Sequence, residues 1–175
     1  MSATPIARLA LAREQMAALK QAAEAAYPNE FCALLIGHDG PGGAVAVSRI
    51  VPADNVDPEP GRGFELDPRV LFKTMRELRE SGSAERLVGH AHSHPDAPAR
   101  PSARDAAQAH EPGLVWLIVP VRKGKAGVAR AFLAEAGVGS GVESGAESGT
   151  GPGAGAAGEG PSVFRPVRLE RPRGA

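Results

Sequence analysis

The order of the predicted elements indicates an α+β domain built on one mixed sheet. Segments with helical periodicity are interleaved with short apolar segments that alternate or are β-branched, in the order helix, strands, helix, strand, helix, strands. The chain has 175 residues, about the length of one domain, and 42% of them are hydrophobic, which is enough for a core. We therefore expect a single domain over residues 1–175.

Three helices are expected from periodicity and from the residues at their ends. Residues 14–26 repeat apolar side chains on one helical face, and Pro28 ends that helix. A second helix begins after Asp67, which can cap it, and continues until Gly82. A third, shorter helix is expected over 102–110.

The predicted strands are short and are separated by turn residues. A Gly-rich turn at 39–43 separates the first two of them. The segments with strand character are 31–36, 44–51, 86–92, 114–121, 128–133 and 162–169.

A low-complexity segment precedes the last strand. Residues 137–160 contain ten Gly together with Ala, Ser and Glu, so they cannot form a packed face. Apolar alternation returns directly after them. We expect a flexible insertion within a hairpin between strands 128–133 and 162–169, and not a linker between domains.

Charge and cysteine content exclude several classes of protein. Lys plus Arg and Asp plus Glu both number 20, which argues against bulk electrostatic binding to nucleic acid or anionic membranes. The single cysteine, Cys32, excludes an internal disulfide or a multi-cysteine zinc site, and its apolar surroundings favour an inert core thiol. No apolar run approaches the length of a membrane span, and residues 6–12 make a poor secretory signal. A cytoplasmic protein is the expectation.

The clearest chemical signal is a pair of histidines at the end of a predicted strand. His92 and His94 have the same parity, so their imidazoles point to one face. Pro95 is expected to stop the ladder and turn the chain away from the sheet. Ser102 then starts a helix, and Asp105 lies on its first turn. Two imidazoles and one carboxylate form a three-ligand zinc site with a fourth position for water.

Other interpretations of these residues remain open at this point. Ser102 and Asp105 have the spacing of a capping box, which requires no metal. The histidines can also be solvated in a loop. His90 shares the parity of His92 and His94 and is a rival ligand. Trp116 is expected in the core.

The pattern resembles the JAMM signature of the JAB1/MPN/Mov34 metalloenzymes. That signature is His-x-His followed by ten residues and an Asp, and ten residues separate His94 from Asp105. The family also has an upstream glutamate at the start of a strand, and segment 27–37 resembles that region with Glu30 in the catalytic place. Asn55 and segment 64–68 resemble the family's middle section.

The resemblance implies a fold, a cofactor and residue roles. The fold would be MPN/cytidine-deaminase-like, with α-β-α layers and a mostly antiparallel sheet flanked by helices. One Zn²⁺ per chain would be held by His92, His94 and Asp105. Glu30 would move the proton from water to the leaving amine, and Ser102 would donate a hydrogen bond to the oxyanion.

The resemblance also implies a substrate class. Compact relatives cleave after the C-terminal Gly-Gly of ubiquitin-like or sulfur-carrier proteins that bear a cysteine or a linked lysine. The partner would therefore be such a protein. A general small-peptide metallopeptidase and a non-catalytic MPN scaffold are the alternatives.

Overall fold

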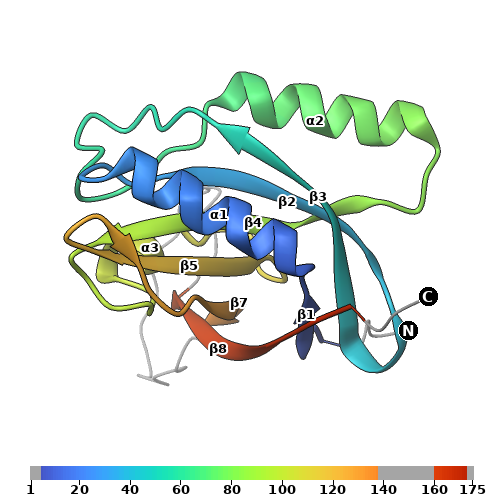
Figure 1. The fold of residues 1–175 in the computed structure, drawn as a ribbon. Coiled ribbons are helices and arrows are strands. Elements are labelled where there is room, and N and C mark those ends of the chain that lie inside the picture. Colours follow the sequence, from blue (N-terminus) through green and yellow to red (C-terminus); the bar gives the residue numbers. More distant parts are fainter. Residues whose placement is uncertain (1–4, 138–159, 173–175) are drawn as a thin grey trace, which may run out of the picture.

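The computed structural model describes residues 5–137 and 160–172, and it contains one eight-stranded mixed sheet with three α-helices in that part of the chain (Figure 1). The elements, in chain order, are β1 Arg8–Ala10, α1 Arg13–Ala26, β2 Cys32–Asp39, a 3₁₀ turn Pro41–Gly43, β3 Ala44–Ala53, α2 Pro68–Ser81, β4 Arg86–Pro95, α3 Ala103–Gln108, β5 Val115–Arg122, β6 Lys125–Ala126, β7 Arg130–Gly137 and β8 Gly160–Glu170.

The sheet closes on itself. Its strand order is β4-β2-β3-β1-β8-β7-β5-β6, and β4 also pairs with β5, so the strands from β4 to β5 form a ring. Among the described strands, only β1–β3, β1–β8 and β4–β5 are parallel pairs. The predicted mixed, mostly antiparallel sheet with flanking helices is thus confirmed, whereas the three-layer description is only partly correct because the sheet curls into a ring.

The two faces of the sheet carry different cores. On β2, Leu35 belongs to the large cluster that also contains Leu19 and Ala23 of α1. Its neighbours Leu34 and Ile36 point to the opposite face, where they pack against α2. Figure 1 shows α1 crossing in front of the sheet and α2 running above it. Alternation along the strand therefore assigns each helix to its face.

Both long helices begin and end near the residues that the sequence indicates. The Asp67 side chain accepts a hydrogen bond from the backbone N–H of Arg69 and caps α2, and Gly82 ends that helix with φ of 61°. Two short strands, β1 and β6, were not predicted. Nonetheless, β1 is essential to the ring, since it joins β3 to β8.

The predicted end of the histidine strand was wrong by a few residues. β4 continues to Pro95, which pairs in parallel with Val121 of β5, and the chain turns only at Asp96, whose φ is 51°. The proline is tolerated because the register between β4 and β2 ends at His92 and the last backbone bond on that side is donated by Ser93 to Phe31, so Pro95 costs no bond to β2. Both histidines consequently lie on the strand.

The strands on either side of the Gly-rich segment pair as predicted. β7 and β8 are antiparallel neighbours, with Ala131 opposite Val167. The predicted flexible insertion itself, apart from its ends, lies outside the described residues. Within the described ranges, no helix is both long and apolar enough to cross a membrane.

Candidate metal centre

Two imidazoles converge at the end of β4. The Nε2 atoms of His92 and His94 lie 3.0 Å apart, and both rings are almost fully buried. Phe64, from the loop before α2, stacks on the His92 ring with a centroid distance of 4.4 Å and an interplanar angle of 21°. The i, i+2 spacing on one strand brings the two nitrogens together, as the sequence predicts.

Asp105 reaches both histidines from the first turn of α3. One carboxylate oxygen lies 3.5 Å from His92 Nε2 and the other lies 3.3 Å from His94 Nε2. The Ser102 backbone N–H donates to the Asp105 carboxylate at 2.6 Å, and Ser102 Oγ accepts from the Asp105 N–H at 3.1 Å. The predicted capping box is therefore present, and it aims the carboxylate at the imidazoles.

The charge state of this cluster favours metal binding. Burial raises the pKa of Asp105, but hydrogen bonds with His92 and His94 outweigh it and hold that pKa below its usual range. The ring of His94 faces the Pro98 carbonyl through Nδ1 at 3.0 Å. Because a carbonyl only accepts, Nδ1 carries the hydrogen and Nε2 presents a lone pair when the ring is neutral.

Glu30, two residues before β2, approaches the same point. Cys32 pairs with His92, so continuing the antiparallel register sets Glu30 opposite His94. Its backbone is held on both sides: its N–H donates to the Pro60 carbonyl at 2.6 Å, and Asn55 Nδ2 donates to its carbonyl at 3.0 Å. Ligand atoms of Glu30, His92 and His94 all lie within 4.8 Å of one another.

The Glu30 carboxyl is buried without a hydrogen-bond partner for Oε2 among the described residues. Burial raises its pKa to about 7. An orphaned buried carboxyl oxygen is costly unless water, a metal ion or substrate meets it. Together with two imidazole nitrogens and a second carboxylate, this donor set fits a zinc ion with a polarised water molecule.

His90, the rival ligand, lies in an aromatic cluster instead. Its ring meets Trp116 edge to face at 4.2 Å and Phe64 at 5.2 Å. Burial lowers its pKa to about 3, so the ring is neutral. Trp116 is buried, as predicted for a core residue, and burial raises the pKa of the Cys32 thiol to about 12.

One supporting ion pair was not predicted. Arg104 Nη2 donates to both carboxylate oxygens of Asp57 at 2.8 and 2.6 Å, which ties α3 to the loop that holds Glu30. The two residues are 47 positions apart, and neither belongs to a recognisable motif. The stacking of Phe64 on His92 was also missed, because nothing in the sequence specifies that contact.

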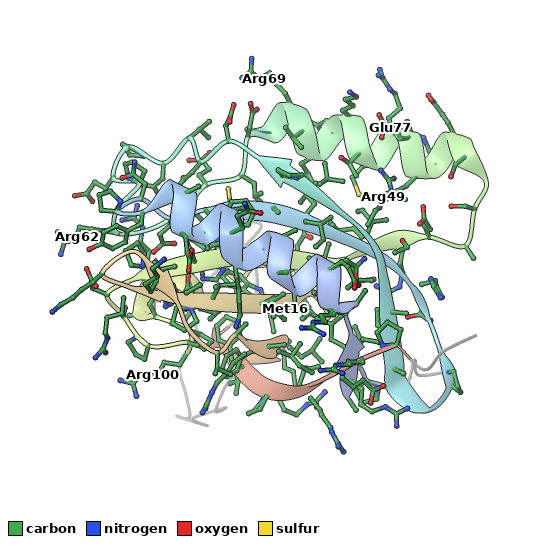
Figure 2. All side chains as sticks on the ribbon, viewed as in Figure 1. Met16, Arg49, Arg62, Arg69, Glu77 and Arg100 are labelled. Carbon is green, nitrogen blue, oxygen red and sulfur yellow. The ribbon has the colours of Figure 1, made fainter. Side chains whose placement is uncertain are left out.

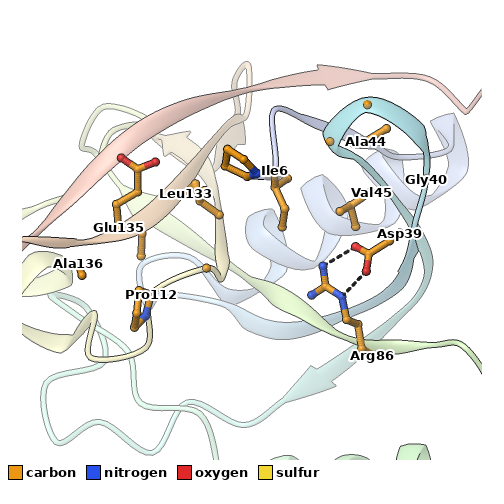
Figure 3. A pocket seen from close by; sticks show the side chains of 15 residues that line it. Ile6, Asp39, Gly40, Ala44, Val45, Arg86, Pro112, Leu133, Glu135 and Ala136 are labelled. Carbon is orange, nitrogen blue, oxygen red and sulfur yellow. Dashed lines mark hydrogen bonds and ion pairs between the residues drawn. The ribbon is translucent and has the colours of Figure 1, made fainter. Parts of the chain in front are cut away.

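A cavity of the protein lies away from these residues. It has a volume of about 710 Å³, and its walls include Ile6, Asp39, Arg86 and Leu133 (Figure 3). Arg86 and Asp39 form a two-bond ion pair in its wall. Arg86 begins β4, so eight residues of strand, roughly 26 Å, separate it from His94. Cavity size alone would therefore place the functional site away from the two histidines.

Comparison of the sequence with known proteins identifies a family and two relatives. Residues 12–134 match the family described as prokaryotic homologs of the JAB domain. Over 91 residues, or 52% of the chain, the sequence is 36% identical to the desampylase of Haloferax volcanii and 38% identical to a Thermus thermophilus protein named "Probable TtuB-protein conjugate cleaving protease". The matched segment spans 62% and 56% of those two relatives, little more than half of each.

Two solved structures share the fold over most of the chain. A solution structure of a protein from Desulfitobacterium hafniense is 28% identical, covers 95% of this chain and 94% of its own, and has a TM-score of 0.65. A solution structure of a protein from Salinibacter ruber, also 28% identical, covers 90% and 99% with a TM-score of 0.52. The two structures therefore share the fold with this chain over nearly their whole lengths.

Proposed function

Because the chain belongs to the prokaryotic homologs of the JAB domain, we propose that it is a zinc metallopeptidase acting on ubiquitin-like or sulfur-carrier conjugates. The bond hydrolysed would be the amide after a C-terminal Gly-Gly. The names of the Haloferax volcanii and Thermus thermophilus relatives, a desampylase and a conjugate-cleaving protease, support this substrate class. A cytoplasmic setting is part of the proposal.

His92, His94 and Asp105 are the proposed zinc ligands, one ion per chain. Their support is the 3.0 Å approach of the two Nε2 atoms and the contact of Asp105 with both. When bound, zinc lowers the pKa of water toward about 7 and polarises a carbonyl oxygen. Pro98 fixes the His94 tautomer, so the neutral ring offers Nε2 to the ion.

Glu30 is the proposed general base and acid. Three protein ligands already complete a catalytic zinc set, so the second carboxylate, that of Glu30, is free to hold a proton. Its Oε2 has no hydrogen-bond partner in the described part of the chain, and the Asn55 and Pro60 contacts fix its backbone. The carboxylate would take a proton from water and deliver it to the leaving amine.

Ser102 is the proposed oxyanion donor. Its side-chain oxygen accepts from the Asp105 N–H in the capping box, which leaves the hydroxyl hydrogen available. The residue is exposed, so substrate can reach it. A single well-placed donor of this kind contributes about 3 kcal/mol to transition-state stabilisation.

The observation that carries the proposal is the convergence of Glu30 with His92 and His94 within 4.8 Å. The test is hydrolysis of a ubiquitin-like protein whose C-terminal Gly-Gly is joined to a cysteine or to a peptide lysine. We expect cleavage after the second Gly, loss of cleavage on metal chelation, and recovery with added zinc. Absence of cleavage by the zinc-loaded protein would contradict the proposal.

The same assay separates the alternatives. A general small-peptide metallopeptidase would cleave unrelated peptides as fast as the Gly-Gly conjugate. A non-catalytic MPN scaffold would bind the conjugate and leave it intact. The presence of Glu30 beside His92, His94 and Asp105 favours an enzyme over a scaffold.

A further inference from the structure

A pocket beside the candidate metal centre is lined by basic side chains. It has a volume of about 570 Å³ and lies between the turn after β4 and the strands β5, β6 and β7. We call it the basic pocket. Its charged lining residues are Arg100, Arg122, Lys125 and Arg130. No acidic residue in the described part of the chain lines it.

These cations are largely uncompensated. Lys125 has Glu24 at 4.0 Å, a long distance for an ion pair, and the Lys125 side chain is 86% exposed. Arg100, Arg122 and Arg130 form no ion pair with any described acidic residue, although the charge of Arg122 lowers the pKa of nearby Asp96. Figure 2 shows Arg100 projecting outward from the body of the molecule. Since the whole chain has a formal net charge of 0, this is a local excess.

The basic pocket adjoins the metal centre through two of its lining residues. Pro98 lines it and also offers the carbonyl that faces His94 Nδ1 at 3.0 Å. Pro120 lines it and is the β5 partner of His94 in the parallel ladder. Directly opposed residues on neighbouring strands, about 4.8 Å apart, point to the same face of a sheet. The pocket therefore opens on the face toward which the His94 ring points.

We propose that the basic pocket binds carboxylate groups of acidic side chains that flank the scissile amide of the substrate protein. The inference rests on the proposed function and deepens it, because it adds an acidic surface to the description of the substrate. Charge complementarity supports this occupant. Arginine, which supplies three of the four cations, pairs with carboxylates through two parallel hydrogen bonds. Val128, 79% exposed at the pocket wall, adds apolar contact area.

The first test is binding of labelled peptides, measured by fluorescence anisotropy. The acidic probes carry a run of Asp and Glu either before or after Gly-Gly-Lys, and the matched neutral probes carry Asn and Gln instead. The Glu30→Gln variant is used so that no turnover disturbs the measurement. In about 50 mM salt, at least one acidic probe should bind at least ten-fold more tightly than its neutral counterpart, and the difference should shrink in about 1 M salt, where the Debye length is about 3 Å.

Charge reversal identifies the site. Arg122→Glu and Arg130→Glu are added together to the Glu30→Gln variant. They should weaken binding of the acidic probe about ten-fold or more and change binding of the neutral probe less than two-fold. Arg13→Glu with Arg76→Glu makes the same change in net charge at exposed residues of α1 and α2 and should leave both affinities unchanged.

The outcomes keep this inference separate from the proposed function. Equal binding of acidic and neutral probes would overturn the proposal that the basic pocket binds acidic side chains, even if the conjugate is cleaved. So would an equal loss of affinity for the acidic probe in the two charge-reversal pairs. Selective binding lost only with Arg122 and Arg130 would support the pocket even if no conjugate is cleaved. In that case the proposed function alone would fail.

Discussion

Replacing Arg104 by methionine tests how the structure holds Glu30 in place. Arg104 lies on α3 beside Asp105 and donates two hydrogen bonds from Nη2 to Asp57, at 2.8 and 2.6 Å. Asp57 belongs to the loop whose Asn55 and Pro60 hold the backbone of Glu30. The Arg104→Met variant keeps most of the side-chain volume and removes the charge.

The size of the effect follows from burial. The Asp57 side chain is 3% exposed and that of Arg104 is 34% exposed. Breaking a fully buried pair costs about 3–5 kcal/mol, whereas a surface pair contributes about 0–1 kcal/mol. Water can reach the arginine side but not the carboxylate, so we expect a loss of about 2 kcal/mol in the free energy of unfolding.

Urea unfolding measures this loss, with Arg69→Met as the matched control. Arg69 pairs with Asp67, whose side chain is also buried at 6% exposure, but the Arg69 side chain is 85% exposed. Asp67 also keeps the hydrogen bond from the Arg69 backbone N–H, so removing the Arg69 side chain should cost less. Adding Asp57→Asn to Arg104→Met should restore part of the stability, because no buried charge is then left unpaired. If Arg104→Met loses no more stability than Arg69→Met, the buried pair does not clamp the loop.

Three further predictions concern the neighbouring residues. Glu30→Gln should retain zinc while hydrolysis falls by about two orders of magnitude; near-normal turnover would remove Glu30 from the mechanism. Gly63→Ala should destabilise the protein as Arg104→Met does, since its Cβ would lie 2.5 Å from Arg104 Nε, and chemical denaturation should show that the two losses do not add. Cys32 is fully buried and its pKa is raised to about 12, so native protein should resist iodoacetamide at about pH 8 and unfolded protein should react; rapid labelling of the native state would contradict the structure.

Local chemistry explains which parts of the site could be predicted from sequence. His92 and His94 are two residues apart on a strand, and Asp105 follows Ser102 at capping-box spacing, so short-range rules bring each group close to the right place. The family resemblance added Glu30, which neither spacing nor composition would have selected. The antiparallel register between β2 and β4 then carries it to His94.

Long-range contacts explain what could not be predicted. The ring depends on β1, only three residues long, and on the parallel pairing of β4 with β5, for which the sequence has no local signal. The Arg104–Asp57 pair and the stacking of Phe64 on His92 join segments far apart in the chain. Pro95 was expected to end its strand, but its missing N–H matters only where a backbone acceptor faces it. On the β2 side, the last backbone hydrogen bond along β4 among the described residues is the one that Ser93 donates to Phe31.

Zinc content is the most direct test of the central claim, that His92, His94 and Asp105 hold one catalytic ion. Elemental analysis should compare the unaltered protein with His92→Ala, Asp105→Ala and His90→Phe, the last of which keeps an aromatic ring in the cluster with Trp116. We predict one zinc per chain in the unaltered protein and in His90→Phe, and less than about a tenth of that in His92→Ala and Asp105→Ala. Full zinc in both alanine variants, or its loss in His90→Phe, would contradict the account.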